Sequence, residues 1–523
     1  MATVTKKRPA KATKNRFIGK PNGHIQERVR SVGPEHFGIV SVDCAKQRSK
    51  WMLCDFYGKV IIEPTVVEHN ASALKAMTDR VKAACQEHKI TDSIIAVEMT
   101  GIYHRPVQRA FRKAGFDTRT VHPFASKHYR RPLHPDCKTD DHDLEAIFHA
   151  AINGYGLATL PVDENYQTMQ LLARHRRNLV KQRARLQVQI RRFLHQTMPG
   201  YADLFDEDNF FNKSIAIHVA LLFPSPVLIR KAGSDGIATK LKQSKIRFQP
   251  CTIDRIVAWA ATADEPATLS TLLTTQWQQL NSMRITLSDQ IEEIEREMAH
   301  FLVKTPYVVL LSVTGINVVS AAGLAGEAGP IEHYASVRAL NGRAGLYPSR
   351  YQSDEVDHAD GSLVRQCNRK LRAAAMMIAE NLIKCHPHYR GLSALWMSQR
   401  VDSRDRRCRI ANRAMRMVYQ LVAGRQLWHG KGVDRDYLLH KLHEFHRVHS
   451  TPIVSSISDM TAAIEWLPKS SYEAESAPLV KLASKRSRGP QQIGDLMLPL
   501  LIRLGVRSAS EVESESSEAR SSN

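Results

Sequence analysis

Hydrophobic and polar positions alternate in short runs over residues 36–155, and this pattern predicts strands and helices in turn. Short apolar runs bounded by polar residues predict buried strands near 37–43, 50–54, 58–64, 93–98 and 117–122. Apolar positions at helical spacing predict helices near 71–88, 104–114 and 140–152. We therefore expect an α/β domain in this part of the chain.

The rest of the chain has the longer periodicity of helices. One long helix is expected from Leu171 through Leu194 and a second over roughly 269–302, and the two can pair as an antiparallel coiled coil. Small residues predict a helix over 318–325, and Asn368 opens another that runs to about Lys384. The last stretch starts with an arginine-rich helix and ends in a Ser- and Glu-rich tail, which we expect to be disordered. These changes divide the chain into 1–35, 36–155, 156–300, 301–400 and 401–523.

The order of three strands followed by alternating helices and strands matches an RNase H-like α/β fold, and four carboxylates coincide with its element ends. Asp43 and Glu98 each close an apolar run, so both are expected at the carboxyl edge of the sheet, where open α/β folds keep their sites. Asp140 and Asp143 start the helix expected over 140–152 and share one face, with Cβ atoms about 5–6 Å apart. Carboxylate oxygens suit Mg²⁺ or Mn²⁺, and paired ions stabilise the oxygens of phosphoryl transfer.

A structural role is the alternative for each acid. Thr139 can cap the helix, and Asp140 and Asp141 suit its positive end. Capping accounts for an acid at a helix start, but it does not account for Asp43 and Glu98. We therefore predict a metal-dependent phosphoryl-transfer site.

The charge of the chain points to a polyanionic partner. Among 523 residues, Lys and Arg number 74 against 52 Asp and Glu, which gives a net charge of +22. Nucleic acid is the first candidate partner and an anionic membrane surface the second. The sequence has no run of about 18 apolar residues, so no transmembrane span is predicted. The N-terminus lacks the apolar core of a secretory signal. Eight cysteines without a Cys-x-x-Cys pair are typical of reduced thiols in a cytoplasmic protein.

Basic residues gather in several places. Each group can contact phosphate or can simply be a solvent-exposed face. The basic arm over 1–35 is expected to be disordered by itself, and it can bind phosphate or serve only as a solubilising tail. The first long helix and the segment over 341–372 carry further candidates for nucleic-acid binding. These are Arg174, Arg177, Lys181, Arg185, Arg343, Arg350, Asn368, Arg369, Lys370 and Arg372. Histidines recur at 440, 443, 446 and 449, but a threefold spacing rotates off one helical face, so no metal site is predicted there.

Two separated sets of motifs carry a family resemblance. The first is Val42-Asp43-Cys44-Ala45-Lys46, Val97-Glu98-Met99-Thr100-Gly101 and Lys138-Thr139-Asp140 with Asp143. The second is Val313-Thr314-Gly315-Ile316, Ala344-Gly345-Leu346-Tyr347-Pro348, Gln352-Ser353 and Asn368-Arg369-Lys370-Leu371-Arg372. Together they resemble the DEDD-type transposases of insertion-sequence family 110, which include the Piv-like DNA invertases. The similarity covers roughly 36–200 and 270–400.

The resemblance implies a fold, a mechanism and partners. It implies a RuvC-like catalytic domain over 36–155, a coiled-coil region with an insertion over 156–300, and a serine-bearing transposase domain over 301–400. Mg²⁺ would be held by Asp43, Glu98, Asp140 and Asp143. Ser353 would attack the scissile phosphate and form a transient phosphoserine link to DNA. Family members act on donor and target DNA as oligomers, here a dimer or tetramer, and some are guided by a structured RNA. A nucleoid-associated bacterial or archaeal enzyme is implied.

Some alternatives stay open. Asp354, Cys367 and Asn317 stand where family members usually have glycine, and Ser349 is the second candidate nucleophile. The chain can also be a RuvC-like nuclease that uses metal-bound water, or a non-catalytic nucleic-acid-binding derivative. The presence of all four acids favours an enzyme.

Overall fold

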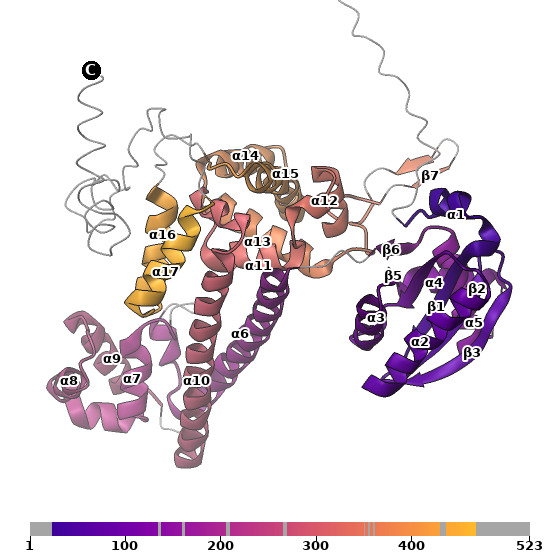
Figure 1. The fold of residues 1–523 in the computed structure, drawn as a ribbon. Helices are drawn as coiled ribbons and strands as arrows, with labels where there is room; N and C mark the ends of the chain where they lie inside the picture. Colours follow the sequence, from indigo (N-terminus) through magenta and orange to yellow (C-terminus); the bar gives the residue numbers. More distant parts are fainter. Residues whose placement is uncertain are drawn as a thin grey trace, which may run out of the picture. The chain divides into compact units, whose positions relative to one another are not determined.

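A computed structural model describes residues 23–133, 137–158, 163–205, 210–264, 269–349, 351–353, 356–358, 361–428 and 436–466. The chain divides into two compact units, Met1–Pro161 and Val162–Asn523 (Figure 1). The first unit is an α/β domain and the second is almost entirely helical.

The first unit is built on a mixed six-stranded sheet. Its strands are β1 (Phe37–Cys44), β2 (Arg48–Asp55), β3 (Val60–Glu68), β4 (Asp92–Glu98), β5 (Asp117–Val121) and β6 (Gly156–Ala158). Their order is β3-β2-β1-β4-β5-β6. The central strands β1, β4 and β5 run parallel, whereas β2, β3 and β6 pair antiparallel with their neighbours. The five longer strands are those that the sequence predicts.

Helices cover both faces of this sheet. They are α1 (Gln26–Val32), α2 (Ala71–Glu87), α3 (His104–Lys113), α4 (Pro123–Leu133) and α5 (Asp140–Ile152), with the 3-10 turn η1 (Pro34–His36). Val40 and Val42 of β1 share a core with α2 and α3. Phe37 and Ile39 of β1 share the opposite core with α1, α4 and α5. Because side chains alternate along a strand, odd-numbered residues of β1 face the α5 side.

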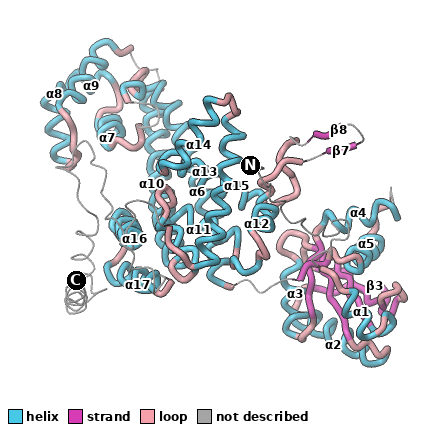
Figure 2. Tube along the Cα trace, turned by 90° about the horizontal axis from the view of Figure 1, so that it is seen from above, coloured by secondary structure: helices cyan, strands magenta, loops and turns pink. Residues whose placement is uncertain are grey.

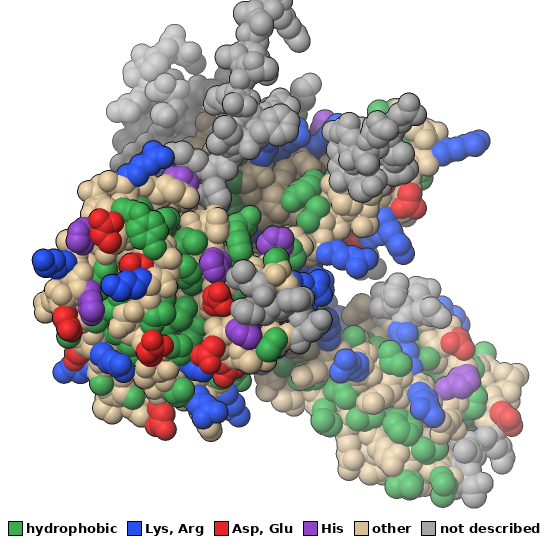
Figure 3. Space-filling view, turned by 90° about the vertical axis from the view of Figure 1, so that its right-hand side faces the viewer, with side chains coloured by type: hydrophobic (Ala, Val, Ile, Leu, Met, Phe, Trp, Pro, Cys, Tyr) green, Lys and Arg blue, Asp and Glu red, His purple; other side chains and the backbone are tan. Residues whose placement is uncertain are grey.

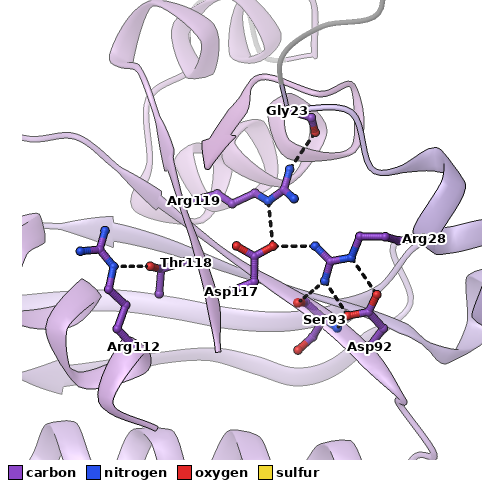
Figure 4. A network of polar contacts seen from close by, with 8 residues as sticks. All are labelled: Gly23, Arg28, Asp92, Ser93, Arg112, Asp117, Thr118 and Arg119. Carbon is purple, nitrogen blue, oxygen red and sulfur yellow. Dashed lines mark hydrogen bonds and ion pairs between the residues drawn. The ribbon is translucent and has the colours of Figure 1, made fainter. Parts of the chain in front are cut away.

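Helix α1 lies inside the segment that we expected to be a disordered arm. Arg28 pairs with Asp92 at 2.5 Å and with Asp117 at 2.5 Å (Figure 4). Arg119 also donates to Asp117 and to the carbonyl oxygen of Gly23. Ile25 and Val29 are buried under this network. The segment is therefore ordered by long-range ion pairs and burial, which its local composition does not reveal; residues 1–22 lie outside the described residues.

Two long antiparallel helices form the axis of the second unit. Helices α6 (Glu164–Thr197) and α10 (Ser270–Leu302) pack along each other, as Figure 1 shows. The chain between them forms η2 (Ala202–Leu204), α7 (Ser214–Leu222), α8 (Pro226–Gln243) and α9 (Pro250–Thr262). These short helices make their own core with Leu194 and Trp277, from the joined ends of the long pair. Within the described residues no single helix is long and apolar enough to span a membrane; α7 and α8 meet that criterion only as a pair bent by 115°.

A larger helical body surrounds the other end of the long pair. Its helices are η3 (Pro306–Ser312), α11 (Val318–Ala328), η4 (Ile331–His333), α12 (Val337–Ala344), α13 (Arg369–Cys385), α14 (Pro387–Ser398), α15 (Ser403–Gly424), α16 (Asp436–Val448) and α17 (Ile453–Ile464). The small hairpin β7 (Tyr351–Ser353) and β8 (Val356–His358) projects from this body between α12 and α13 (Figure 2). Helix α11 lies at the centre of this body, and nearly all of its residues are buried.

The crossing of α11 over α6 gives a stability prediction. A Cβ added at Gly326 would lie 2.5 Å from the backbone nitrogen of Gln170, whereas one added at Gly323 would meet nothing within 4 Å. Gly326→Ala should therefore separate the two helices and destabilise the unit by about 1–3 kcal/mol. Gly323→Ala, one turn earlier in the same helix, should stabilise it by roughly 0.5–1 kcal/mol. Urea unfolding monitored by circular dichroism measures both, and equal effects of the two substitutions would contradict the close crossing.

Candidate active site

Asp43 and Glu98 lie side by side at one edge of the sheet. Strands β1 and β4 are parallel, and Val42 pairs with Val97, so the two acids are the next positions on neighbouring strands. Alternation along each strand places both acids on the α5 side, because Ile39 of β1 and Ala96 of β4 belong to that core. Both side chains are half-buried. The sheet therefore presents two carboxylates to α5.

Helix α5 brings the other two acids. Thr139 is its N-cap, and the Thr139 hydroxyl accepts a hydrogen bond from the backbone N–H of His142. Asp140 and Asp143 lie in the first turn, where the positive end of the helix stabilises negative charge. The helix packs on β1 through Leu144 and Ile147. The capping role that we considered for this segment is present, and the acids beside it still face the strand ends.

Repulsion among these acids acts on Asp43. Burial raises the pKa of Asp43 to about 6, and the negative charges of Glu98, Asp143 and Asp140 add to the effect. The positive charge of Lys138 opposes it. The four acids are therefore close enough to interact, and the central one resists ionisation.

The acidic cluster is also contacted by side chains that the sequence pattern did not predict. Ser126 of α4 donates to Oε1 of Glu98, and Thr100 donates to Oε2 at 3.3 Å. Arg130, one turn along α4, pairs with Asp143. The only readable signal is the i, i+4 spacing of Ser126 and Arg130, and α4 itself was not predicted because its sequence ends in a basic, proline-containing run.

The donor set fits a hard divalent cation in its chemistry. Carboxylate oxygens are the ligands that Mg²⁺ and Mn²⁺ prefer, and a cation would offset the negative charges that surround Asp43. As the side chains stand, however, no three His, Cys, Asp or Glu residues within the described ranges converge closely enough to hold an ion. Glu98 and Asp143 are instead held by their partners on α4.

The second candidate region is a β-hairpin, here called the serine hairpin (residues 347–364). Its stem begins where Pro348 pairs with Leu363 and the N–H of Ser349 donates to the carbonyl oxygen of Ser362 at 2.9 Å. Farther out, Ser353 of β7 pairs with Val356 of β8, the last pair of that ladder. Arg350 and the side chain of Ser353 lie outside the described residues. The backbone therefore puts Ser353 at the far end of the hairpin from its stem.

The alternative serine is engaged within the stem. The Ser349 hydroxyl donates to the carbonyl oxygen of Ser362 at 3.0 Å. A Cβ on Gly361 would lie 2.3 Å from that hydroxyl oxygen, so the two strands approach closely there. Ser349 thus has a structural contact that accounts for it.

Arg372 ties the two ends of the serine hairpin together. Its Nε donates to the carbonyl oxygen of Ala344 at 3.0 Å, and its Nη2 donates to the carbonyl oxygen of Val364. Gly345 closes α12 in the left-handed region with φ 63°, and any Cβ there would strike the Arg372 guanidinium. The predicted nucleic-acid residue Arg372 is therefore held by the protein itself.

Two more of the predicted nucleic-acid residues have structural partners. Arg174 forms a bidentate ion pair with Glu327, with distances of 2.8 and 2.9 Å, and the Glu327 side chain is only 1% exposed. Asn368 caps α13 and donates to Glu327 at 3.3 Å. These contacts fix the start of α13 against α6 and α11.

The remaining basic candidates are open to solvent to different degrees. Lys181 and Arg185 are exposed on α6, Arg177 beside them is half-buried, and Arg343, Arg369 and Lys370 are exposed around the base of the serine hairpin. Figure 3 shows basic and acidic side chains mixed over the face that it presents. Two of the four histidines have acidic partners: His446 of α16 lies 3.4 Å from Asp459, and His449, directly after α16, lies 2.7 Å from Glu295.

The departures from the family pattern have local explanations. Asn317 is the N-cap of α11 and forms a capping box with Ser320, which gives asparagine a function where glycine is usual. Cys367 does not have a positive φ, so it needs no glycine. Its sulfur accepts from Arg372 at 2.8 Å. Asp354 lies outside the described residues.

The raised pKa of Asp43 predicts how stability depends on pH. The pKa of the Asp43 carboxyl is about 4 in the unfolded chain and about 6 in the folded one. The folded state therefore binds more protons between these two pH values. Stability should therefore fall as pH rises through this window and stay lower above it. Asp43→Asn removes the charge, so with chelator present its Tm should exceed that of the wild type at pH 7.5 and match it near pH 4. Asp141→Asn, which breaks the pair with Lys50, should show no such gain, and a gain for Asp43→Asn that does not change with pH would contradict the argument.

Comparison with known families matches both regions. A DEDD family model of IS110 elements, described as a transposase, matches residues 40–199, which include the four acids. A second model, described as a transposase of the IS116/IS110/IS902 family, matches residues 307–393, which include the serine hairpin and α13. A comparison with curated proteins gave no match. Because both models match one chain in this order, the protein belongs to the IS110-type transposases and is a DNA transposase or recombinase.

Proposed function

We propose that this transposase cuts and rejoins DNA through the acidic cluster of an RNase H-like, RuvC-like domain together with Ser353. The observation that carries the proposal is the position of Asp43 and Glu98 at neighbouring strand ends, near the first turn of α5, where burial and the charges of the other acids raise the pKa of Asp43. Acids in this arrangement suit phosphoryl transfer better than they suit a purely structural role.

A divalent cation, Mg²⁺ or Mn²⁺, completes the proposed site. Asp43, Glu98, Asp140 and Asp143 would hold it. When bound, it supplies Lewis-acid stabilisation to the charge that develops on phosphate oxygens. The protein's own contribution is to hold the acids at the ends of buried elements and to keep them in register.

The proposed nucleophile is the Ser353 hydroxyl. Its oxygen forms a bond to the scissile phosphorus while the bond from phosphorus to one deoxyribose oxygen breaks. The serine proton is lost and the leaving strand gains a hydroxyl, so a phosphoserine diester joins the protein to the other strand end. A hydroxyl of a second strand can then attack that diester and restore the serine.

Backbone geometry supports Ser353 over Ser349. Ser349 sits in the stem, and its hydroxyl donates to the carbonyl oxygen of Ser362. Ser353 occupies the last pair of the β7–β8 ladder. A phosphate that meets the hairpin there disrupts fewer contacts within the protein than one that meets the stem.

The proposed partners are donor and target DNA, a second copy of the chain and a structured guide RNA. Exposed Lys181, Arg185, Arg369 and Lys370, with half-buried Arg177, can contact phosphate. Arg174 and Arg372 are assigned structural roles instead, because each is held by the protein. The serine of one subunit would complete the acidic site of another. A nuclease that uses water would need only the acidic cluster and would leave the second matched region without a function.

The serine assignment is tested by Ser353→Ala. The variant should lose DNA strand exchange and the covalent protein–DNA adduct, while its affinity for DNA stays within about twofold because phosphate contacts are spread over many residues. Ser349→Ala is the matched control and should keep both activities. Adduct formation is followed by denaturing gel electrophoresis with labelled DNA. An adduct on Ser353→Ala that disappears in Ser349→Ala would reverse the assignment.

The acidic cluster is tested by Asp43→Asn. Loss of one charged oxygen ligand should lower Mg²⁺-dependent cleavage and strand exchange by about 100-fold or more. Asp141→Asn removes a neighbouring acid outside the proposed set and should keep most of the activity. Unchanged turnover of Asp43→Asn in Mg²⁺ would remove it from the site.

A further inference from the structure

Helix α4 carries two side chains that contact the acidic cluster. Ser126 and Arg130 are four residues apart and share one face of the helix. Ser126 is 3% exposed and donates to Glu98. Arg130 pairs with Asp143, and the two side chains are 19% and 14% exposed. Each half of the acidic cluster, strand and helix, is thus held by one residue of α4.

The contacts rest on fixed packing. On the adjacent stripe of α4, Ala125 is buried in the core that α5 shares, and Tyr129 packs against that core. The Tyr129 ring also meets Tyr155 edge to face, with ring centroids 5.8 Å apart. The helix is therefore seated against α5 and the sheet, and Ser126 and Arg130 are presented to the acids by this seating.

The two contacts differ in charge. The serine hydroxyl orients one oxygen of Glu98 and leaves the negative charge of the carboxylate uncompensated. The arginine guanidinium neutralises Asp143 and occupies its Oδ1. A cation at Asp143 would compete with this guanidinium for the same negative charge, whereas serine and cation can bind Glu98 together.

We propose that α4 controls the loading of the acidic cluster with a divalent cation: Ser126 positions Glu98 as a ligand, and Arg130 holds Asp143 until the cation displaces it. This inference rests on the proposed function, in which the four acids bind that cation. It also accounts for the finding that no three of these acids converge on one point within the described residues. Glu98 and Asp143 are drawn toward α4, and Arg130 supplies the positive charge that the cation would otherwise bring.

The two positioning residues should have opposite effects on cation affinity. Mn²⁺ alone is titrated into the full chain and followed by calorimetry and by its electron paramagnetic resonance signal. Arg130→Gln should lower the Kd for Mn²⁺ by about threefold to tenfold, because the competing charge is gone. Ser126→Ala should raise the Kd by about tenfold, because Glu98 loses its support. The rise in Tm that Mn²⁺ produces should follow the same order.

Matched variants separate this mechanism from simpler ones. Arg131→Gln removes the same charge from the adjacent, exposed position of α4 and should leave the Kd unchanged. Ser126→Thr retains a hydroxyl and should restore wild-type affinity, and Arg130→Lys retains the competing charge and should not bind Mn²⁺ more tightly. Circular dichroism confirms that each variant is folded.

The outcomes also distinguish this inference from the proposed function. If the wild type binds Mn²⁺ and Asp43→Asn does not, the acidic site stands. If in that case Arg130→Gln binds Mn²⁺ as weakly as the wild type or more weakly, the proposed competition between Arg130 and the cation is overturned, and the acidic site still stands. If the wild type and Asp43→Asn bind Mn²⁺ equally, or neither binds it, both the metal site and the role of α4 fail.

Discussion

Repulsion between carboxylates is the interaction that the candidate site of the α/β domain must withstand. Burial raises the pKa of Asp43 to about 6, and the negative charges of Glu98, Asp143 and Asp140 add to the effect, so these acids would separate if the backbone allowed it. The backbone does not allow it, because both strands are buried along their length. The N-terminus of α5 and the cations Lys138 and Arg130 offset part of the repulsion. Hydrophobic burial thus stabilises a charge arrangement that is unfavourable by itself.

The helical unit meets a related constraint in a different way. Glu327 is buried in α11, and an unpaired carboxylate there would be strongly destabilising. Arg174 from α6 and Asn368 at the start of α13 satisfy it. One buried charge therefore fixes three helices at the point where α13 begins. Arg372 follows one turn later and donates to both ends of the serine hairpin, so the base of the hairpin is tied to the start of α13.

Local pattern was sufficient for the elements but not for the contacts between them. The strands β1 and β4 and the helix α5 follow from apolar runs and a capping threonine, and the positions of their acids follow from the same pattern. Ser126 and Arg130 could not, because α4 has a basic, proline-containing sequence and its contact with the acids depends on packing against α5. The same holds for Arg174, whose partner Glu327 is 153 residues away. An exposed basic helix face and a buried ion pair look alike in sequence when the partner is that distant.

The pairing of an acidic cluster with a serine has a thermodynamic reason. Water as nucleophile would end the reaction at a cut, because the free energy of the phosphodiester is lost on hydrolysis. A serine nucleophile exchanges one phosphate ester for another, so the step is nearly balanced and can be reversed by a strand hydroxyl. In the proposed mechanism, water must be kept from competing at the acids that would hold the cation when no serine is present. A guanidinium that neutralises Asp143 leaves the isolated cluster poorly suited to activate water. In this proposal, the same charge arrangement limits attack by water at the isolated acidic site and leaves the site able to rejoin DNA strands.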